Sequence, residues 1–396
     1  MYMTAHRVVG LISGTSIDGI DVAVADLSVV DGVVELVPVD HGEVPYPDDV
    51  RAALRAALPP NACDAAAVCA IDTRVGQAFG AAAAGFAEGA DLVASLGQTL
   101  YHWVDGGRCL GTLQVGEPTW IAEATGLPVV SNLRSRDVAT GGHGAPLAGV
   151  LDRLLLADEP GAAAVNLGGI ANVTVDGTAF DTGPANALLD AAALARTGAP
   201  LDLDGALAAA GAIRRDLLDV LLADPYYAAP APKSTGREHF HRGHLDAALA
   251  QVPEVATADL LATLVALTAM TVAEALIPHR PARVLVSGGG VRNPTLMAAL
   301  AAALAPAEVV RSTTLPAEAK EAYLAALLGY LTWRSAPVDA RTGGLARVHG
   351  SVTPGADPGV WPEPGGVTAT ALRVVPARGR VARDRTPAGA EALHPR

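Results

Sequence analysis

The sequence predicts an α/β protein with two lobes, each built on a β-sheet. The chain has 396 residues, which exceeds the usual size of one hydrophobic core and favours two or three domains. A pattern of strand, glycine turn, strand, turn and strand at residues 8–39 returns weakly at residues 162–181, which indicates an internal duplication. We expect one lobe at 1–150, a second at 151–355, and an extension at 356–396 that ends in a frayed tail from Ala377.

The composition limits the possible partners and compartment. A hydrophobic fraction of 51% with 17% charged residues is typical of a well-packed globular protein, and the net charge of -13 opposes binding to nucleic acid or anionic lipid. Cys63, Cys69 and Cys109 are odd in number and lack CxxC spacing, so a reducing compartment fits best. The first predicted strand begins within a few residues of Met1 and leaves no room for a signal peptide. We predict a cytoplasmic protein that does not bind membranes.

The first lobe is expected to begin with three consecutive strands. Apolar runs and alternation predict them at 8–12, 21–27 and 33–39, followed by helices at 48–58 and 65–88. Asp91–Ser95 is predicted to be a short buried strand that ends in the polar group Gly97-Gln98-Thr99, a suitable wall for a site. Residues 113–116 precede Pro118, which suits the first turn of a helix to Thr125, and 128–131 is a further strand.

The second lobe is expected to repeat the strand triplet and then become mostly helical. The predicted strands lie at 162–167 and 171–175, with a short third strand that ends at Asp181, and a later strand lies at 283–287. Helices are predicted at 185–196, 207–222, 260–277, 295–304 and 317–333. The segment 260–277 is apolar but carries Glu274 and several threonines, so we expect a buried helix and not a membrane span.

The turn Ser13-Gly14-Thr15-Ser16 between the first two strands has the composition of a phosphate-binding loop. Glycines at 14 and 19 let backbone N–H groups turn inward, and Thr15 and Ser16 add hydroxyl donors. The carboxylates of Asp18 and Asp21 would repel phosphate, and a bound Mg²⁺ would screen these charges from each other. An ordinary hairpin turn rich in Gly, Ser and Asp has the same composition.

Other polar segments suggest ligand sites with simpler alternatives. Gly288-Gly289-Gly290 follows a strand, but the G-x-G-x-x-G spacing of a dinucleotide fold is missing. Arg134 and Arg136 beside a glycine-rich turn suit a carboxylate or phosphate, although Arg136 could instead pair with Asp137. The group His239, His241 and His244 could bind a metal, but its spacing matches no common ligand set and a loop or helix start explains it more simply.

Seven segments give the sequence a specific resemblance. In chain order they are GLISGTSIDGID, TLQVGEP, RDVATGGHGAPL, NLGGIANVT, FDTGPAN, APKSTGRE and SGGGVRNPTL. In this order, from residue 10 to about residue 330, they resemble the successive signatures of the anhydro-N-acetylmuramic acid kinases. The resemblance implies a two-lobed actin-like ATPase fold with ribonuclease H-like duplicated sheets around a central cleft, as in hexokinases and other sugar kinases.

The resemblance also implies a reaction. Water opens the 1,6-anhydro bridge of 1,6-anhydro-N-acetylmuramic acid, and the freed O6 takes the γ-phosphoryl group of ATP, giving N-acetylmuramic acid 6-phosphate and ADP in cell-wall recycling. Asp181, in FDTGP, matches the family's catalytic base, and Glu321 matches a functional glutamate, with a helix-surface acid as the alternative for Glu321. ATP, Mg²⁺ and a homodimer are further implications.

The remaining site residues follow from the same positional match. For ATP they are Gly14, Thr15, Ser16, Ile17, Asp18, Gly19, Ile20 and Asp21, with Gly168 and Gly169 as a second phosphate turn and Gly288, Gly289 and Gly290 as the wall against adenosine. For the sugar they are Gln98, Thr99, Arg134, Gly183 and Asn186, of which Arg134 suits the lactyl carboxylate. Direct metal ligands are not assigned.

Departures from the family pattern lie on the sugar side. Leu96 stands for a histidine, Asn132-Leu133 for an Asp-Phe pair, Ala185 for a glycine and His143 for a glutamine. A kinase for another anhydro sugar, such as levoglucosan, is therefore an alternative. A non-catalytic sugar or nucleotide sensor would have no use for the base Asp181, and a glycosidase that pairs Asp181 with Glu321 would leave the phosphate loops unexplained.

Overall fold

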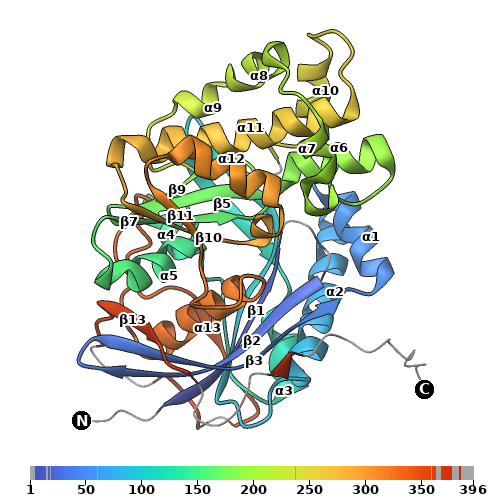
Figure 1. Cartoon of the computed structure of the whole chain (residues 1–396). Helices are drawn as coiled ribbons and strands as arrows, with labels where there is room; N and C mark the ends of the chain where they lie inside the picture. The colour runs from blue at the N-terminus through green and yellow to red at the C-terminus, as the bar shows by residue number, and fades with distance from the viewer. Residues whose placement is uncertain are drawn as a thin grey trace.

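The computed structural model contains two β-sheets and the helices that cover them (Figure 1). It describes residues 5–14, 17, 19–59, 61–236, 238–357, 359–362, 367–376 and 383–384. Thr15, Ser16, Asp18 and most of the predicted tail after Ala377 lie outside these residues. The predicted mixed α/β fold with two sheets is confirmed.

The first sheet is formed around the opening hairpin. Its strands are β1 (His6–Ser13), β2 (Gly19–Val30), β3 (Val33–Pro45), β4 (Leu92–Asp105), β5 (Arg108–Val115), β6 (Val129–Ser131), β12 (Ser351–Thr353), β13 (Ala371–Val374) and β14 (Arg383–Asp384). The central order is β3-β2-β1-β4-β6, antiparallel among the first three strands and parallel from β1 to β4 to β6. Residues of the predicted extension return to this sheet, because β13 pairs with β3.

The second sheet repeats this topology. It consists of β7 (Ala162–Leu167), β8 (Ile170–Val175), β9 (Thr178–Pro184), β10 (Arg283–Ser287) and β11 (Glu308–Arg311) in the order β9-β8-β7-β10-β11. The triplet is again antiparallel, and the two later strands again run parallel to the first. The shared order confirms the duplication that the sequence pattern indicates.

Helices cover the sheets on defined faces. In chain order they are α1 (Asp48–Ala57), α2 (Ala65–Ala84), α3 (Pro118–Thr125), α4 (Ser135–Ala139), α5 (Ala148–Leu155), α6 (Asn186–Thr197), α7 (Ala206–Ala210), α8 (Arg215–Leu222), α9 (Pro225–Ala228), α10 (Arg242–Leu249), α11 (Thr257–Leu276), α12 (Pro294–Leu304) and α13 (Lys320–Trp333). Short 3-10 helices cover Leu156–Asp158, Leu203–Gly205, Ile277–His279 and Gly289–Arg292.

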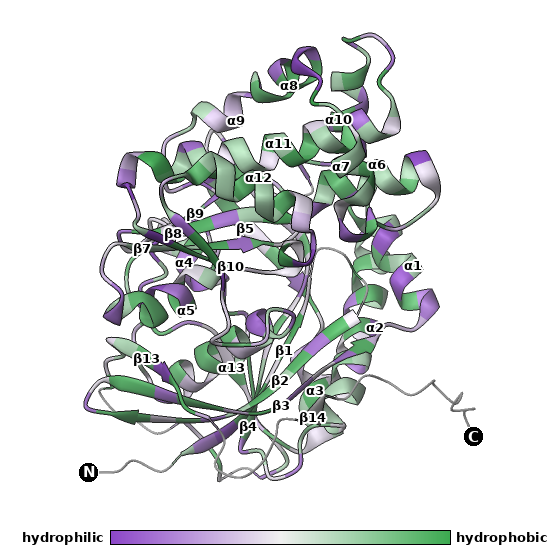
Figure 2. Ribbon diagram, viewed as in Figure 1, coloured by the Kyte–Doolittle hydropathy of each residue, from purple (hydrophilic) through white to green (hydrophobic). Residues whose placement is uncertain are grey.

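The first sheet is buried on both faces. Val9 and Leu11 of β1 pack in one apolar cluster with α1, α2 and α3, whereas Val8 and Ile12 pack in another with α5 and α13. Because both faces are buried, β1 has a continuous run of apolar residues. Figure 2 shows that the strands of the first sheet are largely hydrophobic. The packing against α13 is close, since a Cβ on Gly10 would lie 2.0 Å from the carbonyl oxygen of Ala322.

Helix α11 is the one described segment long and apolar enough to cross a membrane. Its candidate span, Thr257–His279, has a mean hydropathy of 2.1, and 78% of the window is buried inside the protein. Leu261, Leu264 and Val272 belong to the apolar cluster that covers one face of the second sheet. The helix is thus placed in the core, as predicted.

Two predicted elements differ from the structure. The strand expected to end at Ser95 continues as β4 to Asp105, so Gln98 and Thr99 lie within a strand that pairs with β5. The helix expected at 207–222 is divided into α7 and α8. The division lies at Gly211, where a Cβ would lie 2.1 Å from the carbonyl oxygen of Ala258, so the approach of α11 leaves no room for a helical side chain.

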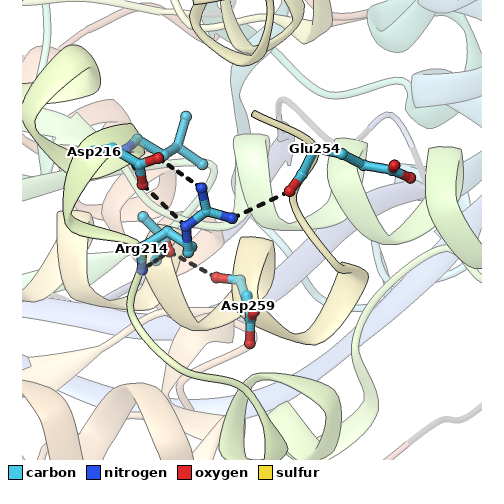
Figure 3. Close-up of polar contacts among 6 residues, drawn as sticks. Arg214, Asp216, Glu254 and Asp259 are labelled. Carbon is cyan, nitrogen blue, oxygen red and sulfur yellow. Dashed lines mark hydrogen bonds and ion pairs between the residues drawn. The ribbon is translucent and has the colours of Figure 1, made fainter. Parts of the chain in front are cut away.

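Side chains around α11 hold the chain at this break. The backbone N–H of Ala212 donates to Asp259 Oδ1 at 2.8 Å, and that of Arg214 donates to Thr263 Oγ1 at 2.9 Å. Figure 3 shows the guanidinium of Arg214 directed at Asp216 and at the backbone carbonyl of Glu254. Tertiary contacts therefore replace the helical hydrogen bonds that a continuous helix would make.

A buried ion pair joins the two sheets. Lys320 Nζ, at the start of α13, lies 2.5 Å from Asp152 Oδ1 of α5 and donates to Ser287 Oγ, the last residue of β10, at 2.7 Å. Both charged side chains are less than a tenth exposed. The rest of α13 packs against the first sheet, and only its first turn contacts the second sheet.

We expect Lys320→Ala to lower the free energy of unfolding by about 3 to 5 kcal/mol, because it leaves the buried carboxylate of Asp152 without a cation. Urea unfolding followed by circular dichroism measures the change. Arg242→Ala is the control, since it removes an exposed ion pair with Asp246 and should cost less than about 1 kcal/mol. Equal costs in the two variants would contradict this account of Lys320.

Candidate active site

A row of buried polar side chains crosses the second sheet. Ser287 of β10 pairs in register with Asn166 of β7, Asn166 with Asn172 of β8, and Asn172 with Asp181 of β9. Residues in register point to the same face of a sheet, and this face is opposite to the one that Val165 and Leu167 bury against α11. The row therefore faces the side on which α5 and α13 lie (Figure 1).

The first turn of α13 contacts this row at the carboxyl ends of β7 and β10. Lys320 reaches Ser287, and the next residue, Glu321, accepts a hydrogen bond from Asn166 Nδ2 at 3.3 Å through its Oε1. The carboxyl ends of parallel strands are where open α/β sheets bind their ligands. Glu321 is therefore not a solvated surface acid but lies at this edge.

Asp181 is held by the loop that contains the sequence KSTG. The backbone N–H of Thr235 donates to Asp181 Oδ2 at 2.9 Å, and the backbone N–H of Asp181 donates to the carbonyl oxygen of Lys233, also at 2.9 Å. The hydroxyl of Tyr226 donates to the backbone oxygen of Asp181 at 2.8 Å. One of these bonds is made to the carboxylate and the other two hold the backbone of Asp181, so the loop fixes both the residue and one of its carboxylate oxygens.

Burial dominates the electrostatics of Asp181. Desolvation raises the pKa of this carboxyl from 3.8 to about 7, against the Thr235 amide, which lowers it. Glu238 adds to the rise, while the positive charges of Arg134 and Lys233 oppose it. A carboxylate with a pKa near 7 is partly ionised at neutral pH and has the proton affinity that a general base needs there.

Arg134 is a cation that interacts with both acids. The charges of Glu321 and Asp181 both raise the pKa of Arg134, although the larger effect of burial lowers it. Its Nη1 donates to the carbonyl oxygen of Gly144 at 2.9 Å, whereas its buried Nε has no hydrogen-bond partner among the described residues. The structure thus brings Arg134, Asp181 and Glu321 into one electrostatic group with an unused donor.

The two glycine turns of the second lobe lie beside each other. Gly288 has a φ of +86°, and a Cβ there would lie 2.6 Å from Asn166 Oδ1, while a Cβ on Gly290 would meet that of Leu167 at 2.6 Å. Gly289 is exposed and has space around it. The carbonyls of Gly168 and Gly169 accept hydrogen bonds from the first amides of α6, including that of Asn186 at 3.1 Å. Gly288 and Gly290 therefore serve close packing, and Gly289 is the open position.

Two predicted sugar contacts, Asn186 and Gly183, have local contacts of their own. Asn186 Nδ2 donates to the carbonyl oxygen of Leu167 at 3.3 Å and so supports the glycine turn. Gly183 has a φ of +144°, and a Cβ there would lie 2.8 Å from the ring of Tyr227. Gly183 lets Tyr227 pack close to β9, next to the loop that holds Asp181.

Gln98 and Thr99 lie on β4 beside the end of β1. Gln98 pairs in register with Ser13, the first residue of the predicted phosphate turn, and is buried. Its Nε2 donates to the carbonyl oxygen of Thr99 at 3.2 Å, while its Oε1 lacks a partner in the part of the chain that the structure describes. Thr99 Oγ1 accepts from Gln114 Nε2 at 3.2 Å. Gln98 therefore offers an unused acceptor next to the first turn.

The first predicted phosphate loop is described only in part, because Thr15, Ser16 and Asp18 lie outside the described residues. The carbonyl of Gly14 accepts from the N–H of Ile17 at 3.3 Å, so the turn closes on itself. Ile17 and Ile20 are fully buried in the apolar cluster under α1 and α2. These two side chains anchor the turn in the core. The other members lie on β2: Gly19 is its first residue, and Asp21 pairs with Ile12 across the hairpin.

A histidine network supports the same KSTG loop, and the sequence reasoning did not identify it. The hydroxyl of Ser234 bridges His102 Nε2 at 3.0 Å and His143 Nδ1 at 2.8 Å. Burial, with the charges of Arg134 and His143, lowers the pKa of His102 to about 4, and burial lowers that of His143. Ser234 has one proton, so one imidazole donates to it and the other accepts. The motif APKSTGRE carried the only signal for this loop.

The structure accommodates the departures from the family pattern in different ways. Leu96 and Leu133 both belong to the apolar cluster beneath α13, so their side chains are core residues and do not line the polar row. Asn132 has a left-handed φ of +53°, a conformation that asparagine tolerates well. His143 belongs to the Ser234 network, and Ala185 is buried before α6.

Comparison with known proteins decides the family. The family model described as anhydro-N-acetylmuramic acid kinase matches residues 6–355. A protein of that name from Streptomyces coelicolor is 51% identical over 387 residues, covering 93% of this chain and 99% of that protein. The chain belongs to the anhydro-N-acetylmuramic acid kinase family. The predicted family and the assignment as a sugar kinase are confirmed.

Other members of the anhydro-N-acetylmuramic acid kinase family are also similar over most of their length. The protein from Rhodococcus erythropolis is 49% identical, with 88% of this chain and 94% of that protein covered, and the one from Gloeobacter violaceus is 38% identical, with 83% and 93% covered. A ROK family glucokinase from Streptomyces griseus, solved with glucose and AMPPNP, aligns with 82% of this chain at 16% identity and a TM-score of 0.37. The last similarity is too low to support any argument.

Asp181→Asn is expected to stabilise the protein in a pH-dependent way. The pKa of Asp181 is raised in the folded protein, so the unfolded chain loses this proton near pH 3.8 and the folded chain only near pH 7. The contribution of the protonated Asp181 to the free energy of unfolding is therefore fully present below pH 3.8 and is lost as the pH rises through about 7. The uncharged Asn keeps the acceptor for Thr235 and escapes this loss. We expect its advantage in free energy of unfolding to grow by about 2 to 3 kcal/mol between pH 5 and pH 8. A constant difference in urea unfolding across that range would contradict a buried, ionising Asp181.

Proposed function

We propose that this member of the anhydro-N-acetylmuramic acid kinase family acts on 1,6-anhydro-N-acetylmuramic acid and ATP and forms N-acetylmuramic acid 6-phosphate and ADP in cell-wall recycling. The observation that carries the proposal is the buried carboxylate of Asp181, which burial brings to a pKa of about 7 beside the cation Arg134. The names of the relatives support the sugar, and the family supports phosphoryl transfer.

Asp181 serves as the general base in this reaction. Its ionised form takes one proton from a water molecule, and the water oxygen bonds to the anomeric carbon of the sugar. The bond from that carbon to O6 breaks, and O6 takes the γ-phosphoryl group of ATP, so ADP leaves. The Thr235 amide holds the carboxylate in one orientation through the reaction.

Arg134 binds the lactyl carboxylate of the sugar. Its buried Nε lacks a partner among the described residues, and a guanidinium recognises a carboxylate with two parallel hydrogen bonds. This unused donor favours the acid-bearing sugar over levoglucosan, which has no carboxylate. Gln98, with its unused Oε1, and Thr99 lie on the first-lobe side of the sugar.

The nucleotide is bound by the glycine turns. Gly168 and Gly169 lie at the edge of the second sheet next to Gly288, and the open Gly289 suits the wall against adenosine. The first turn, Gly14–Asp21, contributes from the other lobe and is anchored by Ile17 and Ile20. Gly183 and Asn186 act by positioning, since they support the loops around Asp181 and Leu167.

Mg²⁺ fits the donors at this edge. The carboxylate of Glu321 and the amide oxygen of Asn166 are the oxygen ligands that Mg²⁺ prefers, and the hydrogen bond from Asn166 Nδ2 holds the two groups together. Held by these residues, Mg²⁺ would neutralise charge on the phosphates of ATP. We assign Glu321 this catalytic role, with Asp18 and Asp21 as further acids of the loop.

The test of the proposal is ADP release with a panel of anhydro sugars that carry or lack the lactyl acid. We expect the sugar with the acid to be preferred, and Arg134→Gln to reduce that preference by about 10- to 100-fold, the usual value of a charge-assisted hydrogen bond. Arg136→Gln is the matched control, because Arg136 is exposed two residues away. Asp181→Asn should lower kcat at least about a hundredfold. Equal rates with both sugars in the wild type would remove the assigned substrate.

We also propose that the protein is a cytoplasmic homodimer. Tyr101, Trp103, Leu110 and Leu113 are 42 to 51% exposed on the β4–β5 hairpin, an apolar surface that a second copy would cover. Sedimentation velocity is expected to show a dimer for the wild type and a monomer for Trp103→Lys, with Leu203→Lys, an exposed leucine elsewhere, as the control. A dimer that survives Trp103→Lys would place the interface on another face.

The three cysteines are free, which is consistent with the proposed reducing compartment.

A further inference from the structure

Asp224, His239 and His244 form a cluster that the kinase reaction does not use. Asp224 precedes α9, His239 lies in the turn before α10, and His244 lies on α10. Asp224 Oδ2 is 2.8 Å from His239 Nε2 and 3.8 Å from His244 Nδ1. The three candidate ligand atoms all lie within 4.8 Å of one another. One carboxylate oxygen thus faces two imidazoles that are five residues apart in sequence.

The donor set selects a class of metal ion. Two imidazole nitrogens and a carboxylate oxygen suit Zn²⁺, which binds both at about 2.0 to 2.2 Å, whereas Mg²⁺ prefers an all-oxygen shell. A tetrahedral ion with such bonds places neighbouring ligand atoms about 3.4 Å apart. His239 and Asp224 would separate slightly and His244 would move inward, so side-chain adjustments are enough. Three protein ligands leave a fourth position for water.

The ligands are oriented by groups behind them. Asp224 Oδ1 accepts from the backbone N–H of Tyr226 at 2.8 Å, which directs Oδ2 toward the histidines. The rings of His239 and His244 pack against Phe240 with centroid distances of 4.4 and 5.2 Å. His239 is 38% exposed and Asp224 only 12%, so the cluster is open to ions from the His239 side. Such supporting contacts are typical of built metal sites.

His241, which the sequence pattern groups with the other two histidines, is not part of the cluster. Its Nδ1 accepts from the backbone N–H of Gly243 at 3.0 Å and caps the start of α10. The prediction of a helix start is confirmed for His241. The third ligand comes instead from Asp224, 15 residues before His239.

We propose that Asp224, His239 and His244 bind one Zn²⁺ ion and that the ion stiffens the loop that holds Asp181. The connection is short: the residue that orients Asp224 is Tyr226, whose hydroxyl donates to the backbone of Asp181. Lys233 Nζ, in the same loop, donates to the carbonyl oxygens of Tyr226 and Tyr227, each at 2.9 Å. Binding of the ion is independent of the proposed kinase reaction.

Calorimetric titration of the full-length chain with Zn²⁺, after treatment with EDTA, tests the site. We expect one ion to bind per chain, and His244→Ala and the milder His239→Gln to weaken that site by more than about tenfold, since even the loss of an outer-shell partner has this effect. His279→Ala is the matched control: its Nδ1 lies 2.7 Å from Asp176 Oδ2, a histidine–aspartate pair that belongs to no described three-ligand cluster. Mg²⁺ should not compete for the site.

Hydrogen exchange tests the connection to Asp181 without using activity. Zn²⁺ is expected to slow amide exchange across residues 225–236 in the wild type and in His279→Ala, but not in His244→Ala. Circular dichroism without zinc establishes that each variant is folded. The metal site is overturned if the wild type binds no Zn²⁺ or if His244→Ala binds it with wild-type affinity. Unchanged exchange with bound zinc would overturn the stiffening of the loop.

Discussion

The first turn of α13 is the constraint on which the arrangement of the two sheets depends. The body of this helix is buried against the first sheet, yet its first two residues end on the second, Lys320 at Ser287 and Glu321 at Asn166. The buried partner of Lys320 is Asp152 of α5, so three elements meet in one low-dielectric contact. A buried ion pair adds little net stability, because the cost of removing both charges from water offsets their attraction. Separating the two charges is costly, however, so the contact fixes the relative position of these elements.

The same contact lies beside a row of polar side chains at the carboxyl ends of β7 and β10. Ser287 is the last residue of β10 and Asn166 the last but one of the adjacent parallel strand β7, and the row continues through Asn172 to Asp181. Apolar residues at these positions would pack well, as they do on the opposite face, where Val165 and Leu167 lie in the core. The protein instead keeps polar groups at four consecutive register positions of a buried sheet face. Ser287, Asn166 and Asp181 have hydrogen-bond partners, whereas Asn172 Oδ1 is buried without one among the described residues, which carries a cost in stability.

The sequence predicted the parts of this arrangement that are local. The strand triplets, the glycine turns and Asp181 at a strand end follow from periodicity and residue type. The polar row depends on strand register, which no local pattern reveals, and the division between α7 and α8 depends on the approach of Ala258 to Gly211. Strand β11 escaped prediction because it has four residues with charged ends. The support of Asp181 by Thr235 joins residues 54 apart in sequence, so only the motif could indicate it.

The ionised form of Asp181 is held at a cost, and contacts from both lobes fix the loop beside it. Holding an ionised carboxylate in this place is unfavourable by on the order of 4 kcal/mol, given a pKa raised from 3.8 to about 7. This amount already includes the hydrogen bond from the Thr235 amide, which lowers the pKa of Asp181 but does not cancel the effect of burial. Further hydrogen bonds hold the loop: Lys233 is bonded to two carbonyl oxygens, Ser234 to two histidines, and Tyr226 to the backbone of Asp181. None of these hydrogen bonds is made to the carboxylate itself, and the charge of Lys233 lowers its pKa less than burial raises it, so the carboxylate keeps the high proton affinity that base catalysis requires while its position stays fixed.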